Sequence, residues 1–433
     1  MIDKIFNPKS IAIIGATDRI NSVGRGVVEN LKNKKRKIFY INPNKDKVFE
    51  RKTYKNINDI KERIEFAIIV IPQKFVSVAV DDCILKKVKT VMIISSGFKE
   101  TSKKGGLLEK DIAKKLKEAN INLIGPNTLG VIRPSKNLNA SFAPCTPKEG
   151  EMAFIFQSGG LIDAMVDGIN KKNFGFSFIV SVGNEAGLSF ADYIKMADED
   201  KYTNAIALYV EGISSGRDFY KATENCTKPV IIIKAGKAEK AQKAITSHTG
   251  SLAGTYQIFS GAMKQAKAFE VYSLQELIDT TKALAWISKT AKKIGVVTNT
   301  GGVGVLLVDY LEKQNFKFPK ISYKSKSITS NTNPLDILGD ALTEKYEIAC
   351  TAVMKNKNIS LLVVVQTPQI MTEPVENAKM LVRLKKKYKK PIVTIFMGEG
   401  EKTIKAINYL EKNKIPNYSD PYRAVKPLLA ITS

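Results

Sequence analysis

The sequence predicts an α/β protein of three consecutive domains, each with a mainly parallel β-sheet. Three apolar runs rich in Ile, Val and Phe support this prediction, because each stops at a glycine-bearing turn and passes into a helical pattern. These runs cover residues 10–17, 152–160 and 294–302. Such runs with helices between them are typical of buried parallel strands. The length of 433 residues also suits about three domains of ordinary size. We therefore expect each run to open one domain.

The first predicted domain covers residues 1–135 and alternates strands with helices in a Rossmann-like order. Its strands are expected at 11–14, 38–41, 66–71, 91–95 and 121–124, and its helices near 24–33, 74–86 and 105–118. Residues 133–150 contain three prolines and show no apolar periodicity. We interpret this stretch as a linker.

The second predicted domain covers residues 150–288 and the third covers residues 292–433, with a charged junction between them. In the second domain, strands are expected at 152–156, 176–180, 205–210 and 230–234, followed by a basic loop at 234–240 and helices from about 254 to 288. In the third domain, strands are expected near 294–298, 359–365 and 391–396, and residues 417–421 lead into a final short helix.

The composition is that of an ordinary soluble globular protein, with 44% hydrophobic and 25% charged residues. The formal net charge of +26 attracts phosphate groups at long range. Its lysines are scattered along the whole chain, however, and no basic segment with interleaved aromatic residues accompanies them. Nucleic acid is therefore not an expected partner, whereas anionic small molecules or an acidic protein are.

The cysteines and the apolar runs limit the chemistry and the location. The four cysteines form no Cys-x-x-Cys pair and the chain has a single histidine, so no metal site is expected. Widely spaced cysteines are typical of free thiols in a reducing cytoplasm. No apolar run approaches the roughly 20 residues that cross a bilayer, and the N-terminus lacks a signal-peptide core. We expect a cytoplasmic protein that does not bind a membrane.

Glycine-rich turns between a strand and a helix are candidate anion sites, because they expose backbone N–H groups at the positive end of the helix dipole. The first turn, residues 15–26, does not fit Gly-x-Gly-x-x-Gly, and the second strand ends at Asn42, where a NAD site usually has an acidic residue. NAD is therefore disfavoured, and a nucleotide with more phosphate groups, such as coenzyme A (CoA), fits better. Its expected contacts are Thr17, Arg19, Arg25 and Lys45.

His248 is the only histidine in the chain, and small hydroxyl residues and glycines flank it. It follows a predicted strand of the second domain, and Glu211 follows the strand before that. The carboxyl ends of parallel strands meet at one edge of a sheet, so both residues are expected near the turn formed by Ser158, Gly159 and Gly160. This combination favours phosphoryl transfer through a phosphohistidine.

Two other interpretations of this segment are weaker. A lone histidine is often structural, but the flanking residues form no apolar face that would bury it. A serine nucleophile at Ser247 or Ser251 is possible, yet residues this close to His248 do not easily reach the geometry of a catalytic triad.

The motifs resemble those of the NDP-forming acyl-CoA synthetases, and most closely the α subunit of archaeal ADP-forming acetate–CoA ligases. The most specific match is Ser247-His248-Thr249-Gly250-Ser251-Leu252-Ala253-Gly254. Supporting matches are Gly125-Pro126-Asn127-Thr128-Leu129-Gly130, Gln157-Ser158-Gly159-Gly160, Tyr209-Val210-Glu211-Gly212-Ile213, Thr298-Asn299-Thr300-Gly301-Gly302 and Asn333-Pro334-Leu335-Asp336. The resemblance implies a Rossmann-like CoA-binding domain followed by two flavodoxin-like domains of the succinyl-CoA synthetase type. A third domain after the histidine domain favours the acetate-type arrangement.

The resemblance also implies roles for individual residues. His248 would be phosphorylated, Glu211 would stabilise it, and the turn Ser158, Gly159 and Gly160 would cradle the phosphate. CoA would contact Gly15, Ala16, Thr17, Arg19, Asn42, Pro43, Val70, Ile71, Pro72, Ser95, Ser96, Glu100 and Asn127. The chain departs from the common family pattern at Thr128, Gly160, Thr300 and Val303, and none of these changes removes a reacting group.

The family also needs an ATP-grasp module that holds ADP or ATP with Mg²⁺, and three α/β domains leave no room for it in this chain. The resemblance therefore implies a separate β subunit, in an α2β2 heterotetramer. The expected reaction interconverts acyl-CoA, ADP and phosphate with a small carboxylic acid, ATP and CoA, through acyl phosphate and phosphohistidine intermediates. The alternative from another class is a module that binds or senses CoA or acyl-CoA without turnover.

Overall fold

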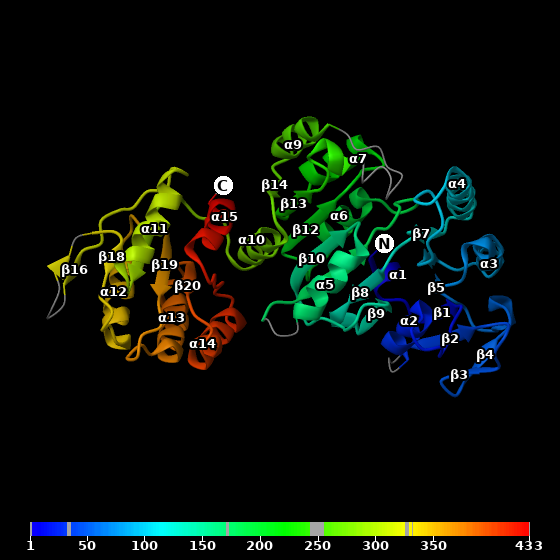
Figure 1. Ribbon diagram of the computed structural model, residues 1–433, viewed down its shortest axis with the longest axis horizontal. Helices are drawn as coiled ribbons and strands as arrows, with labels where there is room; N and C mark the ends of the chain where they lie inside the picture. The colour runs from blue at the N-terminus through cyan, green and yellow to red at the C-terminus, as the bar shows by residue number, and fades with distance from the viewer. Residues whose placement is uncertain are drawn as a thin grey trace. The chain divides into compact units, whose positions relative to one another are not determined.

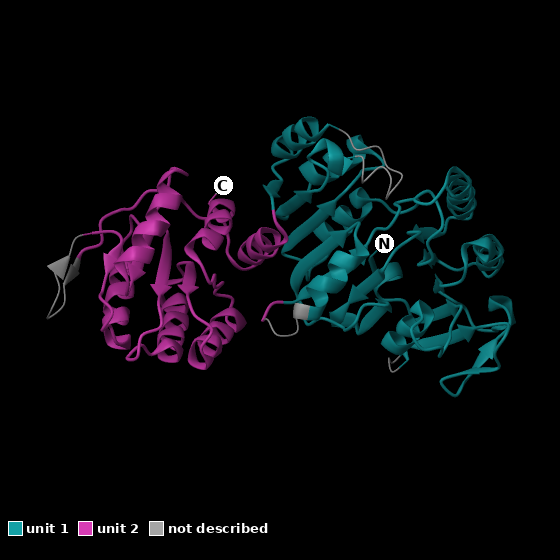
Figure 2. Ribbon diagram, in the orientation of Figure 1, with its two compact units in different colours: residues 1–171, 175–272 teal, residues 172–174, 273–433 magenta. Residues whose placement is uncertain are grey.

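The computed structural model describes residues 2–32, 36–169, 173–242, 255–324, 329–330 and 332–432. The chain divides into two compact units (Figure 2). Unit 1 comprises residues 1–171 and 175–272, and unit 2 comprises residues 172–174 and 273–433. Unit 1 contains two large sheets and unit 2 contains a smaller one (Figure 1).

The first sheet of unit 1 has the order β3-β4-β2-β1-β5-β6-β7. Its strands are β1 (Ser10–Ile14), β2 (Lys37–Ile41), β3 (Lys47–Val48), β4 (Arg51–Tyr54), β5 (Phe66–Ile69), β6 (Thr90–Ile93) and β7 (Asn122–Ile124). All neighbours pair in parallel except β3 and β4. From β4 to β7 this is the strand order of the Rossmann fold. The predicted fold of the first domain is therefore confirmed, with β3 and β4 as additions that the sequence analysis missed.

The helices around this sheet form where the sequence provides caps and an apolar face. They are α1 (Ile2–Phe6), α2 (Val23–Leu31), α3 (Val76–Leu85) and α4 (Lys103–Glu118), with the short 3₁₀ turns η1 (Ile57–Asp59) and η2 (Gln73–Phe75). The side chain of Ser22 caps α2 and that of Ser102 caps α4, each by accepting a backbone N–H of the first turn. Helix α2 buries Val27, Val28 and Leu31.

The second sheet of unit 1 has the order β14-β13-β12-β10-β11-β8-β9. Its strands are β8 (Gly130–Arg133), β9 (Leu138–Ser141), β10 (Glu149–Phe156), β11 (Phe176–Ser181), β12 (Ala205–Val210), β13 (Val230–Lys234) and β14 (Phe269–Val271). The five strands from β10 to β14 are parallel and follow the flavodoxin order. The helices of this part are α5 (Gly159–Ile169), α6 (Phe190–Glu199), α7 (Gly216–Glu224) and α9 (Tyr256–Gln265).

The prediction of a linker over residues 133–150 was wrong. Strands β8 and β9 pair with each other in antiparallel fashion, and β8 joins the edge of the second sheet at β11. Pro134 opens the single 3₁₀ turn η3 (Pro134–Lys136) between them, where proline is favourable because it needs no N–H partner. Every residue of both strands is buried. A short, buried hairpin of this kind shows little periodicity in the sequence.

The sheet of unit 2 is parallel throughout, with the order β18-β15-β19-β20. Its strands are β15 (Ile294–Thr298), β18 (Leu335–Asp336), β19 (Leu361–Gln366) and β20 (Ile392–Phe396), and a separate ribbon pairs β16 (Tyr323–Lys324) with β17 (Thr329–Ser330). The helices are α10 (Leu274–Trp286), α11 (Gly301–Glu312), α12 (Thr343–Lys355), α13 (Pro374–Tyr388), α14 (Glu401–Lys412) and α15 (Pro421–Ile431). The predicted fold class, consecutive α/β domains with mainly parallel sheets, is confirmed.

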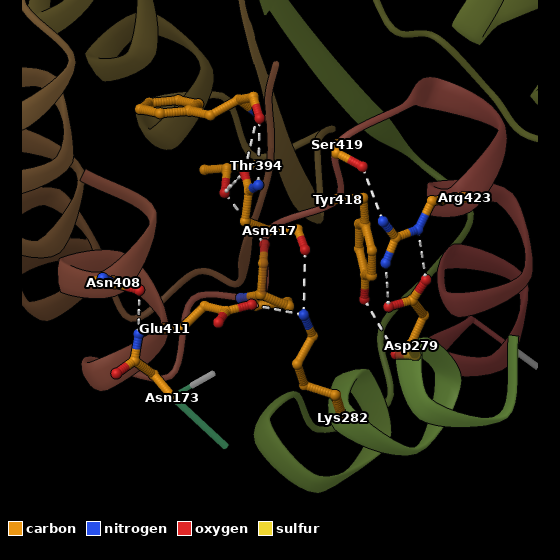
Figure 3. Close-up of polar contacts among 12 residues, drawn as sticks. Asn173, Asp279, Lys282, Thr394, Asn408, Glu411, Asn417, Tyr418, Ser419 and Arg423 are labelled. Carbon is orange, nitrogen blue, oxygen red and sulfur yellow. Dashed lines mark hydrogen bonds and ion pairs between the residues drawn. The ribbon is translucent and has the colours of Figure 1, made fainter. Parts of the chain in front are cut away.

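Helix α10, which the sequence analysis placed at the end of the second domain, packs against α15 within unit 2. A buried polar network holds it there (Figure 3). Arg423 donates two hydrogen bonds of 2.9 Å to the carboxylate of Asp279. The ammonium of Lys282 lies 2.6 Å from a carboxylate oxygen of Glu411. The network therefore ties α10 to residues that lie more than a hundred positions later in the chain.

Candidate functional site

The first candidate site lies where the strand order of the first sheet reverses, between β1 and β5. Ligands of open α/β sheets bind outside the carboxyl ends of the strands at such a switch point. Gly15 follows β1 with a φ of +96°, and a Cβ atom added to it would lie 2.2 Å from the carbonyl oxygen of Val70. Only glycine allows this close approach of the two strand ends.

Two cavities open at this edge of the sheet. A cavity of about 960 Å³ extends from the Gly15 turn to the Ser158 turn of the second sheet. A second cavity, of about 780 Å³, also borders the Gly15 turn and shares Arg19 and the β5 exit at Val70 with the first. The two cavities are therefore neighbours at this edge of the sheet.

Most residues predicted to contact CoA line one of these cavities. Those lining the larger cavity are Gly15, Thr17, Arg19, Val70, Ile71, Pro72, Ser95, Ser96 and Asn127, and the smaller one adds Asn42 and Pro43. Among the described residues of the prediction, Ala16 and Glu100 line neither cavity. Ala16 is buried behind the turn, where its carbonyl accepts a hydrogen bond from Asn42.

The carboxylate of Glu100 is engaged inside the protein. It accepts hydrogen bonds from the backbone N–H groups of Gly97 and Phe98 and from the side chain of Asn184. Burial raises the pKa of Glu100, but these hydrogen bonds outweigh it and the net pKa is lowered. Glu100 therefore shapes the loop after β6 and leaves the lining of the cavities to its neighbours.

Two cations that the sequence analysis assigned to the nucleotide form ion pairs within the protein. Arg25 lies 2.9 Å from Glu29, one turn further along α2. Lys45 forms an ion pair with Asp18. Neither Arg25 nor Lys45 lines one of the two cavities. Arg19 lines both cavities, and Lys55 lines the smaller one.

The second candidate site lies at the switch point of the second sheet, between β10 and β12. The side chain of Gln157, which follows β10, accepts hydrogen bonds from the backbone N–H groups of Glu211 at 2.6 Å and Gly212 at 2.9 Å. These bonds bring the Ser158 turn and Glu211 together, as the sequence analysis predicted. The sequence analysis did not foresee that Gln157 is the link.

Glu211 is itself buried, with 8% of its surface exposed. Its backbone carbonyl accepts a hydrogen bond of 2.7 Å from the ammonium of Lys234. Burial, together with the neighbouring charge of Glu211, raises the pKa of Tyr209 to about 12. Two residues beyond Gly212, the backbone N–H of Ser214 donates to the buried carboxylate of Glu185. The loop that carries Glu211 is thus held at several points.

The Ser158 turn leads directly into α5, so the positive end of this helix faces the larger cavity. Ser158, Gly159 and Gly160 all line the cavity, and a Cβ atom at Gly160 would meet nothing within 4 Å. Asp163, one turn later, also lines it, and burial raises the pKa of its carboxyl group. Backbone N–H groups at the start of a helix favour a phosphate or an oxyanion.

His248, with Ser247 and Ser251, falls within residues 243–254, outside the described residues. The described residues on either side of this segment share one partner. Glu270 on β14 accepts hydrogen bonds from Lys237 at 3.1 Å, from Tyr256 at 2.7 Å and from Ser260 at 2.8 Å. Described residues on both sides of this segment are therefore held by the same carboxylate.

The sequence analysis missed several residues of this region. The burial of Lys234 is one such case, although the residue was predicted to end its strand. A single charged residue at the end of an otherwise apolar strand was the available signal. Asn184 and Glu185 gave no signal, because their role depends on a turn in which Glu185 has a φ of +58°.

Across the described residues there is no cluster of three or more His, Cys, Asp or Glu side chains that could hold a metal ion. None of the described helices has both the length and the apolar character that a membrane span requires.

Comparisons with known proteins agree with this arrangement. A model of a CoA binding domain matches residues 9–134, and a model of a succinyl-CoA ligase like flavodoxin domain matches residues 149–284. The α subunit of ADP-forming acetate–CoA ligase II of Pyrococcus furiosus is 36% identical over 97% of this chain and 95% of its own length. The ADP-forming acetate–CoA ligase of Methanocaldococcus jannaschii is 39% identical over 98% of this chain but 62% of its own length.

The solved structures include a similar protein of Ca. Korarchaeum cryptofilum, described as a dinucleotide forming acetyl-coenzyme A synthetase 1 in complex with phosphate and ADP. It superposes with a TM-score of 0.92 at 32% identity, over 100% of this chain and 96% of that one. A CoA-binding fold followed by a succinyl-CoA ligase-like fold defines the class of acyl-CoA ligases. Within this class, the chain belongs to the family of ADP-forming acetate–CoA ligases, which confirms the resemblance predicted from the motifs. It spans 95 to 97% of the two α subunits of acetate–CoA ligases from Pyrococcus furiosus, and 62 to 63% of two longer relatives.

Proposed function

We propose that the chain is the α subunit of an acid–thiol ligase that interconverts acyl-CoA, ADP and phosphate with a carboxylic acid, ATP and CoA. The observation that carries this proposal is the cavity of about 960 Å³, which joins the CoA-type turn at Gly15 to the anion-type turn at Ser158. Glu211 is linked to the second turn through Gln157. A thioester and a phosphate can therefore meet in one place.

In the first step, CoA lies along the two cavities with its acyl thioester toward the Ser158 turn. An oxygen of inorganic phosphate attacks the thioester carbonyl carbon, the carbon–sulfur bond breaks, and the CoA thiolate leaves. The products are an acyl phosphate and CoA. The N–H groups at the start of α5 stabilise the negative charge that develops on the oxygens.

In the second step, one imidazole nitrogen of His248 attacks the phosphorus of the acyl phosphate. The bond between phosphorus and the acyl oxygen breaks, the carboxylate leaves, and a phosphohistidine forms. The carboxylate of Glu211 accepts the hydrogen bond of the other ring N–H, which orients the ring and balances its charge. The phosphoryl group then passes from His248 to ADP.

The site for ADP is proposed to lie on a partner. Relatives of this chain are named as α subunits, and others carry additional chain length, so an ATP-grasp β subunit is the proposed source. ADP or ATP and Mg²⁺ would bind there, in an α2β2 heterotetramer located in the cytoplasm. The acid remains a small carboxylic acid, since relatives are named for both acetate and 4-hydroxybutyrate.

The test is transfer of label from phosphate to the chain. The purified chain and its β partner are incubated with acetyl-CoA and radiolabelled phosphate, and label on the α chain is measured. We expect the wild type to become labelled at His248, His248→Asn to stay unlabelled, and Glu211→Gln to be labelled about 10²-fold more slowly. Full labelling of His248→Asn would contradict the mechanism. CoA binding without any labelling of the wild type would show a binding module without turnover.

A further inference from the structure

Lys234 is a buried lysine at the edge of the second sheet, with 5% of its surface exposed. It ends the apolar strand β13 and pairs in register with Val210, the residue before Glu211. Its ammonium donates hydrogen bonds to the backbone carbonyls of Glu211 and Ala235. The ring of Phe259 on α9 lies 5.8 Å from the ammonium. The positive charge therefore sits directly beneath the loop that carries Glu211.

The position of this charge is energetically unfavourable for folding alone. Removing an ammonium from water costs several kcal/mol, even after the protein relaxes. No carboxylate of the described residues forms an ion pair with Lys234, so two carbonyl groups and an aromatic ring are its compensation. Burial lowers the pKa of Lys234, and the attraction of Glu211 opposes this effect. An apolar side chain of similar length would fill the site at a smaller cost.

Among the described residues, three side chains anchor the loop after β12, and each makes a different kind of contact. Gln157 accepts the N–H groups of Glu211 and Gly212, and Glu185 accepts the N–H of Ser214. Lys234 alone among these three anchors donates to a carbonyl and brings a positive charge. Unlike the other two anchors, Lys234 therefore holds this loop with a positively charged group.

We propose that Lys234 is a positioning residue, which fixes the Glu211 loop and keeps a positive charge beside the Glu211 carboxylate during phosphoryl transfer to His248. This proposal rests on the proposed function. A nearby cation favours the charged form of a carboxylate, and this form is the stronger acceptor for the imidazole N–H and balances the charge of the ring. Among the described residues, the other charged or titratable groups around this site include Tyr209, Glu185, Lys237 and Glu270.

A second lysine, just before the same strand, provides a matched control. Lys228 lies just before the amino end of β13, and its ammonium donates to the carbonyls of Ala197 at 2.7 Å and Asp200 at 2.6 Å. Burial lowers the pKa of Lys228 as well. Lys228 thus has the same kind of contacts as Lys234, at the end of the strand away from Glu211. Lys228 is half-buried, whereas Lys234 is buried. A general loss of lysine–carbonyl contacts affects both positions, whereas a loss specific to Glu211 affects only Lys234.

The experiment uses the full chain with its β partner and measures the rate of His248 labelling from acetyl-CoA and radiolabelled phosphate, from about pH 5 to about pH 9. Lys234→Met should lower the rate at neutral pH by about tenfold to hundredfold, because Glu211 loses its fixed position. Removing the cation raises the pKa of the carboxylate, so activity should be lost on the acid side at a pH about 1 unit higher. Lys234→Arg should keep the acid limb near its wild-type position, and Lys228→Met should change neither quantity.

Thermal unfolding of each variant separates folding from function. The proposal is overturned if Lys234→Met behaves like Lys228→Met, or if the acid limb of Lys234→Arg moves as far as that of Lys234→Met. It is also overturned if Lys234→Met loses rate equally at every pH in proportion to a lower melting temperature. These outcomes leave the proposed function standing, because the wild type is still labelled at His248. A wild type that takes no label overturns both.

Discussion

Single side chains connect the two turns on which the chemistry depends. Gln157 is the clearest case, because one amide oxygen accepts two N–H groups of the neighbouring strand exit. Gly15 is a second case, since its close approach to Val70 leaves no room for a side chain. Both residues contact the backbone of a neighbouring strand exit. A substitution at either position should therefore also displace the residues that follow that strand.

Replacing Gln157 by leucine should destabilise unit 1 and slow phosphoryl transfer. Leucine fills similar space but accepts no hydrogen bond, so the N–H groups of Glu211 and Gly212 lose their acceptor. A buried donor left without a partner costs about 1 to 3 kcal/mol. Chemical denaturation measures the loss, and Gln157→Glu is the control because a carboxylate still accepts both bonds. A leucine variant as stable as the wild type would show that the two N–H groups find another acceptor.

At the scale of helices, charge burial makes stability depend on pH. Lys385 lies in the last turn of α13, and its ammonium donates to the carbonyls of Asn413 and Lys414 after α14. Burial, with a smaller effect of Lys414, lowers the pKa of Lys385 from 10.5 to about 8. Between these two pH values the unfolded chain binds one proton more than the folded chain. The contribution of Lys385 to the free energy of unfolding therefore rises with pH across this window.

This contribution should amount to no more than about 3 kcal/mol between pH 8 and pH 10.5, because each pKa unit corresponds to about 1.4 kcal/mol and Lys385 is only partly buried. Lys385→Met should lack the rise and be more stable than the wild type at neutral pH. Lys386→Met, at an exposed position of the same helix, should keep the rise. Denaturation at several pH values compares the three proteins. Parallel curves for the wild type and Lys385→Met would contradict the assignment.

The strands that the sequence analysis predicted are those with a continuous apolar run, such as β1, β10 and β15. The elements it missed have other signatures. Strands β8 and β9 are short and separated by a proline turn, and their burial comes from pairing with β11 and from packing against α2. Asn30 on α2, for example, donates to the carbonyls of Ser141 and Ala143. Such long-range contacts leave no periodic trace in the sequence.

The parts of the candidate site that could be predicted from the sequence are those at glycine turns and at the ends of apolar strands. Glu211 and the Ser158 turn were predicted together, because both follow parallel strands of one sheet. The contribution of Gln157 and the burial of Lys234 were not predictable, since the fold alone decides which side chains point beneath a strand exit. The roles of Arg25 and Lys45 were predicted from their charge alone, and nearby acids already pair with both.

At the scale of the whole molecule, the boundary between the two compact units does not coincide with the charged, poorly apolar junction in the sequence. The charged junction at residues 288–293 follows α10, whereas unit 2 begins at Ser273, before this helix. The network around Asp279 and Lys282 explains the difference (Figure 3). Lys282 and its partner Glu411 are nearly buried, at 4% and 9% side-chain exposure. Separating α10 from unit 2 would leave the carboxylate of Glu411 buried without its cation.

Two fragments of the chain test this division. Residues 273–433 retain α10 and should unfold in one cooperative transition. Residues 288–433 lack it, so Arg423 loses Asp279 and Glu411 loses Lys282. Removing one partner of a buried ion pair costs about 3 to 5 kcal/mol, so the shorter fragment should unfold at much lower temperature or fail to fold. Lys282→Met in the longer fragment isolates the ion pair from the apolar packing of α10. Equal melting temperatures for the two fragments would show that α10 adds nothing to unit 2, and that the charged junction is the true boundary.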